Sequence, residues 1–328
     1  MSLFSRRLRG YQVGQWWSRL IGKSISTPSS GRVCFFVPDK SKGWILDAVC
    51  HEIAQRSQCV SEFCGNYKAL PQVETYFFCH YHFYLSALRI NPWLAGKNCV
   101  VWFTHPKEAD FGAPETIAAL QKATVVTMCS KWRNLLIDKG LHPERVTTIV
   151  GAADPDLFPT HRRGGGKVGF CTAYYERKNP NRILELVRML PEFQFVLLGR
   201  NWEQSPQLPH MLSLPNFEYR EASYSEYPQF YAELDVFVSA SELEGGPIPL
   251  LESMMSNVVP VASDTGFAPD VIQHGQNGFL FACDEPESAV IAQLVRRAME
   301  LEGDIRSSVL RYNWDAYASQ HDPLFRAA

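Results

Sequence analysis

The sequence lacks several features that would assign it to a special class of protein. It has no apolar run near the ~20 residues that a membrane-spanning helix needs, and Arg19 and Lys23 interrupt any apolar core of a signal peptide. It has no excess of charge of one sign, because the formal net charge is −2 over 328 residues. Nucleic acid is therefore not an expected partner. No solenoid repeat or low-complexity tract is present.

Paired cysteines are also missing. Nine cysteines are scattered along the chain, an odd number without a C-x-x-C pair, which indicates reduced thiols in a cytosol rather than a disulfide framework. The chain is 46% hydrophobic and 20% charged, as is typical of a globular protein. Its length suits two domains, each able to bury a core. We therefore expect a cytoplasmic protein.

The first 31 residues carry basic residues and no acidic one. A helical spacing brings their large apolar side chains to one face, and these are Val13, Trp16, Trp17, Leu20 and Ile21. A basic amphipathic helix with tryptophans suits the interface of an anionic membrane. Residues 1–25 are thus a candidate for peripheral contact with the cytoplasmic face of a membrane. The alternatives are a helix packed on the first domain and a loose tail.

Strand-like and helix-like segments alternate from residue 32 onward. The first series predicts strands at 32–37, 75–79, 98–104, 124–129 and 146–150, with helices at 44–56, 84–90, 114–123 and 131–139. The second series predicts strands at 168–172, 193–198, 234–238, 258–263 and 279–281, with helices at 181–190, 227–232 and 249–255. Such alternation predicts parallel sheets with right-handed crossovers.

The glycine-rich, charged segment 159–167 is the expected boundary between the two series. We predict an N-terminal segment at 1–31, a first Rossmann-like domain at 32–160, a second at 161–308, and a helix at 309–328 that returns to the first domain. Two doubly wound halves bind ligand at the carboxyl ends of their strands, where they face each other.

The motif around which these elements are organised is Glu244-x7-Glu252. Glu244 opens a turn through Gly245 and Gly246, and Pro247 and Ile248 lead into a helix that carries Glu252. Glycine lets the backbone approach a ligand closely, and free N–H groups at a helix start can hold an anion. Two carboxylates about two helical turns apart could then grip hydroxyls on either side of a bound phosphate.

This motif is followed by VVPVASDTG at 258–266 and by Gly275-x-Asn277-Gly278-Phe279. In that order the elements resemble the donor-binding half of glycosyltransferase family 4. The resemblance implies the GT-B fold, an α/β architecture in which two Rossmann-like, doubly wound domains face each other across a cleft. It also implies transfer of a sugar, with retention, from a UDP- or GDP-sugar to a hydroxyl of a glycan or lipid-linked glycan. No metal or other cofactor is expected.

The resemblance assigns roles to individual residues. Glu244 is expected near the transferred sugar, Glu252 at the ribose hydroxyls, and Lys178, in the segment TAYYERKNP, at the diphosphate. A fixed cation there stabilises the negative charge that grows on the leaving phosphate. The family's arginine six residues before this lysine is Thr172 here, and Arg177 is the candidate replacement. The expected donor-binding residues are Arg177, Lys178, Gly245, Gly246, Pro247, Ile248 and Glu252.

Histidines and a D-x-D sequence complete the set of candidates. His105 ends the strand in VVWFTHP, and the resemblance implies that it contacts the donor sugar, so the expected catalytic residues are His105, Glu244 and Lys178. His80 and His82 are predicted to alternate along a strand, and a packed strand end is favoured over a metal site because no third ligand is evident. Asp154-Pro155-Asp156 is interpreted as a turn that docks Phe158.

Two other functions remain open from the sequence. A sugar-nucleotide epimerase or hydrolase can share this architecture, and it would act on the donor without an acceptor. A non-catalytic nucleotide-sugar-binding protein would bind the donor without transfer. Replacing Glu244 by alanine separates these hypotheses, since it abolishes transfer by an enzyme and only weakens binding by a carrier.

Overall fold

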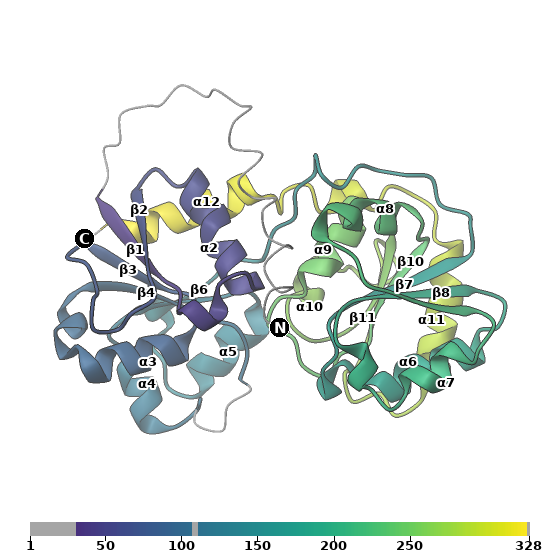
Figure 1. Cartoon of the computed structure of the whole chain (residues 1–328), viewed down its shortest axis with the longest axis horizontal. Coiled ribbons are helices and arrows are strands. Elements are labelled where there is room, and N and C mark those ends of the chain that lie inside the picture. The colour runs from purple at the N-terminus through teal and green to yellow at the C-terminus, as the bar shows by residue number, and fades with distance from the viewer. Residues whose placement is uncertain (1–30, 107–110, 327–328) are drawn as a thin grey trace, which may run out of the picture.

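The computed structural model describes residues 31–106 and 111–326. The amphipathic helix predicted at residues 1–25 lies outside this part of the chain. Figure 1 shows two α/β halves side by side, the earlier one in purple and blue and the later one in green. Each half contains one six-stranded sheet in which all strands are parallel. The predicted fold class is confirmed.

The first sheet has the strand order β2-β1-β3-β4-β5-β6. Its strands are β1 (Arg32–Phe36), β2 (Val60–Cys64), β3 (Thr75–Phe78), β4 (Asn98–Phe103), β5 (Thr124–Thr127) and β6 (Val146–Thr148). The helices of this half are α2 (Ile45–Arg56), α3 (Tyr81–Ile90), α4 (Pro114–Leu120) and α5 (Ser130–Asp138). Every residue of β3 is buried, as expected for a parallel strand with helices on both faces of its sheet.

The second sheet has the order β12-β11-β10-β7-β8-β9. Its strands are β7 (Lys167–Cys171), β8 (Gln194–Leu198), β9 (Phe217–Arg220), β10 (Val236–Ser239), β11 (Val259–Ser263) and β12 (Phe279–Phe281). Its helices are α6 (Pro180–Met189), α7 (Leu208–Leu212), α8 (Tyr227–Ala232), α9 (Ile248–Met255), α10 (Ala268–Val271) and α11 (Ser288–Glu300). Among the described helices, none is long and apolar enough to cross a membrane.

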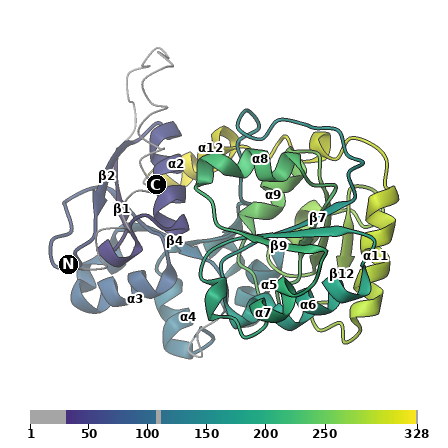
Figure 2. The ribbon, with the colours of Figure 1, turned by 45° about the vertical axis from the view of Figure 1, so that its right-hand side comes forward.

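The last helix, α12 (Trp314–Phe325), belongs spatially to the first half. Figures 1 and 2 both show it in yellow beside α2. Asp322 accepts a 2.6 Å hydrogen bond from the hydroxyl of Ser57, at the end of α2. The hydroxyl of Thr75, on β3, donates to the carbonyl oxygen of Phe325 at 3.0 Å. The chain therefore crosses twice between the halves, which ties the end of the second half to the first.

The sequence interpretation missed two edge strands and misplaced two histidines. β2 and β9 were not predicted, because each lies at a sheet edge and mixes polar with partly exposed apolar residues. The prediction that His80 and His82 alternate along a strand is wrong. β3 ends at Phe78, His80 is the N-cap of α3, and His82 lies in its first turn.

Each sheet has one place where the strand order reverses. In the first sheet the chain moves from β1 to β2 at one edge and then to β3 on the other side of β1. In the second it runs from β7 through β8 to β9 and then returns to β10 on the other side of β7. Loops diverge at the carboxyl ends of such strand pairs and leave room for a ligand. These two places are where a functional site is expected.

Candidate functional site

A cluster of three charges occupies the reversal point of the second sheet. Lys178 ends a short 3₁₀ turn (Glu176–Lys178) after β7, and Glu244 lies in the turn after β10. The Lys178 ammonium donates to Oε1 of Glu244. The Arg177 guanidinium lies 3.5 Å from Oε2 of the same carboxylate. The structure thus brings together three of the predicted site residues that are 66 and 67 positions apart in sequence.

The position of Lys178 follows from the local sequence. Asn179 adopts a left-handed conformation with φ of 56°, which asparagine tolerates better than most residues. Its side chain then accepts a hydrogen bond from the backbone N–H of Arg182 and caps α6. The two basic residues are therefore held directly before the start of a helix. Arg177 also donates to the carbonyl oxygen of Leu243 at 2.6 Å, so its head lies at the same turn.

The two cations keep Glu244 ionised in a buried place. The Glu244 residue is 7% exposed, and burial by itself raises the pKa of its carboxyl. The charges of Lys178 and then Arg177 outweigh burial and bring the pKa below its ordinary value. A buried carboxylate held against two cations leaves a site with net positive charge, which is suited to an anionic ligand.

Glu252 lies in a different environment. It is 2% exposed, and its two carboxylate oxygens accept hydrogen bonds from Tyr224 at 2.7 Å and Tyr231 at 2.9 Å. Burial raises its pKa to about 7, although both tyrosine hydroxyls favour the ionised form. Desolvation outweighs the two hydrogen bonds here because no described cation pairs with this carboxylate.

The glycine turn packs against the first half. A Cβ on Gly245 would lie 2.4 Å from the carbonyl oxygen of Thr104, and one on Gly246 would lie 2.6 Å from Sδ of Met128. Ile248 is 6% exposed, and its Cδ1 would meet a Cβ built on Gly151 at 2.9 Å. Pro247 precedes α9 as its N-cap. The close approach that these small residues permit is thus, in this structure, to the first half.

His105 reaches the same region from the other side. It follows β4 and is the neighbour of Thr104, whose carbonyl oxygen lies closest to Gly245. Its charge also acts on His80 and helps to lower the pKa of that ring. His105 thus follows the residue that meets the glycine turn, and it lies near enough to His80 for their charges to interact.

Three contacts that the sequence did not suggest join α5 to the second half. The indole N–H of Trp132 donates to the carbonyl oxygen of Glu244 at 2.9 Å. Asp270 accepts from the backbone N–H of Ser130 at 3.0 Å and also from the hydroxyl of Ser130, so it caps α5 from the opposite half. Lys131 donates to the carbonyl oxygen of Asp264 at 2.9 Å. No local sequence pattern marks such partners.

Tyr224 and Tyr231 were also missed. Tyr224 begins the 3₁₀ turn that precedes α8, and Tyr231 lies near the end of α8, seven positions later. A spacing of seven returns side chains to about the same helical face. That aromatic pair, preceding the strand that leads to Glu244, was the available signal.

The D-x-D sequence forms a turn. Oδ1 of Asp154 accepts hydrogen bonds from the backbone N–H groups of Asp156 at 2.8 Å and Leu157 at 3.3 Å. Phe158 is fully buried, in agreement with the predicted docking role. Within residues 31–106 and 111–326 no group of three or more His, Cys, Asp or Glu side chains is arranged to hold a metal ion.

Thr172, at the place of the family's arginine, has a structural role. Its carbonyl oxygen accepts a 2.7 Å hydrogen bond from Trp202, and its hydroxyl donates to the carbonyl oxygen of Ala173 at 3.1 Å. Arg177, the predicted replacement, is the second cation near Glu244.

Comparison with known proteins identifies a family match in the second half and two curated relatives. Residues 160–320 match the family model of glycosyl transferases group 1. Sulfoquinovosyl transferase SQD2 of Arabidopsis thaliana is 37% identical over 99 residues, which are 28% of this chain and 19% of that protein. The amylovoran biosynthesis glycosyltransferase AmsK of Erwinia amylovora is 21% identical over 212 residues, 58% of this chain and 51% of its own. The chain thus spans at most about half the length of these curated relatives.

Solved structures cover both halves. The complex of HepE from Anabaena with UDP-glucose superposes with a TM-score of 0.70 at 13% identity, over 88% of this chain and 98% of that one. A glycosyltransferase from Rickettsia africae gives a TM-score of 0.70 at 12% identity, over 90% and 98% of the two chains. At such identities the likeness concerns the fold, which is that of the GT-B proteins.

Proposed function

We propose that this chain, whose residues 160–320 form a domain of the glycosyl transferases group 1 family, transfers a sugar from a UDP- or GDP-sugar to a hydroxyl group of a glycan or lipid-linked glycan. The observation that carries this proposal is the placement of Lys178 and Arg177 around Glu244 at the reversal point of the second sheet. A nucleotide diphosphate needs positive charge at such a place.

The chemistry is a displacement at the anomeric carbon. An acceptor oxygen forms a bond to that carbon, the bond from the carbon to the β-phosphate oxygen breaks, and the electron pair goes to the phosphate. The acceptor proton passes to the leaving phosphate, on the same face of the sugar, so that configuration is retained. Lys178 and Arg177 stabilise the growing phosphate charge more than the ground state. They supply the positive charge that a metal would otherwise bring.

The ion pair with Glu244 prepares Lys178 for this role. Before the donor binds, Glu244 holds the ammonium at the carboxyl end of β7. An arriving phosphate shares that ammonium, and the Glu244 carboxylate can then accept a hydroxyl of the donor sugar. His105 faces the sugar from the first half. Gly245 and Gly246 bring the backbone close, with Pro247 and Ile248 setting the start of α9.

Glu252 is proposed to hold the ribose. Each carboxylate oxygen can accept more than one hydrogen bond, and Oε1 of Glu252 accepts one from the hydroxyl of Tyr224. A ribose hydroxyl therefore shares Oε1 with Tyr224 or displaces it. Tyr231, fully buried, keeps the carboxylate in place.

Among donors, UDP-sugars are favoured. UDP-glucose is the ligand of the HepE structure, which has the same fold, and amylovoran biosynthesis is the process of the AmsK relative. A polysaccharide or lipid-linked acceptor also suits the basic, tryptophan-bearing residues 1–25, which would hold the protein on the cytoplasmic face of an anionic membrane.

The test begins with thermal shifts for a panel of UDP- and GDP-sugars, with and without a chelator. A donor that stabilises the protein is then incubated without acceptor, and products are followed by NMR, which also reports anomeric configuration. Slow hydrolysis, abolished in Glu244→Gln and unaffected by the chelator, is the expected result. Rapid isomerisation without acceptor would establish an epimerase, and binding with no turnover under any acceptor would establish a carrier. Failure of every nucleotide sugar to stabilise the protein overturns the proposal.

A further inference from the structure

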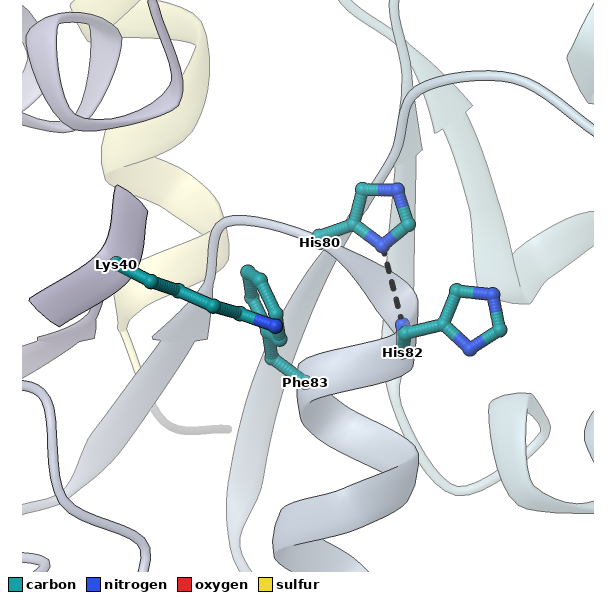
Figure 3. A pocket seen from close by; sticks show the side chains of 4 residues that line it. All are labelled: Lys40, His80, His82 and Phe83. Atoms are coloured by element: carbon teal, nitrogen blue, oxygen red, sulfur yellow. Dashed lines mark hydrogen bonds between the residues drawn. The ribbon is translucent and has the colours of Figure 1, made fainter. Parts of the chain in front are cut away.

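A hollow lies at the reversal point of the first sheet. It has a volume of about 350 Å³, and Lys40, His80, His82 and Phe83 line it. Figure 3 shows these side chains at the end of β3 and the start of α3, with Lys40 reaching in from the loop after β1. Two separate loops thus contribute to one concave place, where a parallel sheet offers room for a ligand. We call these four residues the basic hollow.

The Lys40 ammonium has no carboxylate partner within the described residues. It lies 5.7 Å from the centre of the Phe83 ring. Lys42, in the same turn, is different, since it pairs with Asp39 at 2.7 Å. The only acid of this turn is therefore already engaged, and the charge of Lys40 is directed at the hollow.

His80 adds a hydrogen-bond donor. Its Nδ1 accepts a 3.3 Å hydrogen bond from the backbone N–H of His82, so the proton of the neutral ring is on Nε2. Figure 3 shows this second nitrogen on the side of the ring away from that bond. Burial, and then the charges of His82 and His105, lower the pKa of His80 to about 3. The ring therefore stays a neutral Nε2–H donor at physiological pH.

Together these groups favour one class of ligand. Among the described lining residues none is acidic, one is a cation and one is a fixed N–H donor. Negatively charged oxygens match this set, since charge-assisted hydrogen bonds are the strong ones. The Phe83 face beside the cation offers an apolar surface to a ring or chain attached to the anion. His80 follows β3, and His105, which faces the donor sugar in the proposed function, follows the neighbouring strand β4. The hollow and His105 therefore lie at the same carboxyl edge of the first sheet.

We propose that the basic hollow binds a negatively charged oxygen group, a phosphate or a carboxylate, of the substrate that accepts the sugar. The identification of this substrate as the acceptor rests on the proposed function, whereas the anion site itself does not. The acceptor is thus an acidic molecule, and the anion orients its hydroxyl toward the donor.

The first experiment measures binding of inorganic phosphate by calorimetry to the full chain, with and without saturating UDP to occupy the diphosphate site. Lys40→Gln should weaken the UDP-resistant binding about tenfold, since it removes a charge-assisted contact. Lys122→Gln is the matched control, because that exposed lysine belongs to the first half but does not line the hollow, and it should bind as the wild type does. Equal phosphate binding by Lys40→Gln and wild type overturns the proposal, and so does complete displacement of phosphate by UDP.

The second experiment distinguishes a phosphate from a carboxylate as the bound anion. It also tests the anion site separately from the proposed sugar transfer. With the best donor, glucose 6-phosphate, glucuronate and glucose are compared as acceptors. One charged sugar should be preferred, and Lys40→Gln should raise its KM while the KM of the donor stays constant. A preference for neutral glucose contradicts an acidic acceptor. If UDP does not bind but phosphate binding depends on Lys40, the anion site stands and the nucleotide-sugar function falls.

Discussion

The indole nitrogen of Trp132 lies 2.9 Å from the carbonyl oxygen of Glu244 and donates a hydrogen bond to it. The donor belongs to α5 of the first half and the acceptor to the turn after β10 of the second. Since the side chain of Glu244 holds Lys178, this bond links the first half directly to the proposed catalytic turn. The hydrogen bond from Trp132 holds the backbone of Glu244, while Lys178 and Arg177 hold its carboxylate.

Trp132→Phe removes this link. It should cost about 1–3 kcal/mol of unfolding free energy, because a buried carbonyl oxygen loses its donor. Turnover should fall about tenfold, since small misplacements of reacting groups are expensive. Chemical denaturation and steady-state kinetics measure both. Trp93→Phe, at a residue that is 40% exposed, is the control, and equal behaviour of the two variants would contradict a positioning role for Trp132.

Lys178→Met should abolish most activity and reverse a pH dependence. The loss in turnover should be about 10² to 10³, the size found when a transition-state charge loses its partner. In the wild type the depressed pKa of Glu244 stabilises the fold above the ordinary carboxyl pKa, and that stability is lost as pH falls through the folded pKa. Without Lys178, the effect of burial on the pKa of Glu244 exceeds that of the remaining cation, Arg177, so this pKa should rise above its ordinary value.

The variant should therefore lose on the order of 3 kcal/mol at pH 7.5 and much less at pH 5. Denaturation at the two pH values checks this difference. Adding Glu244→Gln should restore stability at pH 7.5 but not activity. Lys122→Met, at an exposed lysine, is the matched control. A loss of stability that is the same at both pH values would show that Lys178 contributes packing rather than charge.

Glu252→Gln should make the ligand-free protein more stable. Because burial raises the pKa of Glu252 to about 7 from 4.5, unfolding releases a proton between these values and stability falls as pH rises. The variant cannot ionise at this position, so its unfolding free energy should exceed that of the wild type by on the order of 3 kcal/mol above pH 7 and should equal it below pH 4.5. Donor affinity should fall at the same time, since a neutral amide accepts ribose hydroxyls less strongly.

Tyr224→Phe supplies a second test of the same carboxyl. It removes the hydroxyl that donates to Oε1 of Glu252 and so should raise the pKa of that carboxyl further. The pH at which stability stops falling should move upward. Parallel stability curves for wild type, Glu252→Gln and Tyr224→Phe would mean that Glu252 does not titrate in this range.

Gly245→Ala tests the contact between the halves. The new Cβ would lie 2.4 Å from the backbone oxygen of Thr104, an overlap that only backbone movement can relieve. We expect a loss of about 1–3 kcal/mol, a larger radius of gyration in X-ray scattering, and weaker donor binding. Gly96→Ala is the control, because nothing lies within 4 Å of its Cβ. Unchanged scattering and donor affinity in Gly245→Ala would show that Gly245 and Thr104 are not in contact in the conformation that binds the donor.

The sequence by itself determined the features that depend on neighbouring residues. Buried runs of Val, Ile and Phe alternate with helical segments, and this alternation is enough to predict two parallel sheets. The Glu244 turn and the helix that carries Glu252 are likewise local, because glycine and proline set the turn and the helix period sets the distance to the second carboxylate.

Tertiary structure alone decided which groups meet. Lys178 and Arg177 reach Glu244 because the strand order puts β7 beside β10, and Tyr224 and Tyr231 reach Glu252 from 28 and 21 positions away. His80 became a helix cap rather than a strand residue, since β3 ends two positions earlier. These outcomes depend on packing between segments far apart in the chain. The same packing buries Glu244 and Glu252 and, among the described residues, brings cations to Glu244 only, so it lowers the pKa of Glu244 and raises that of Glu252.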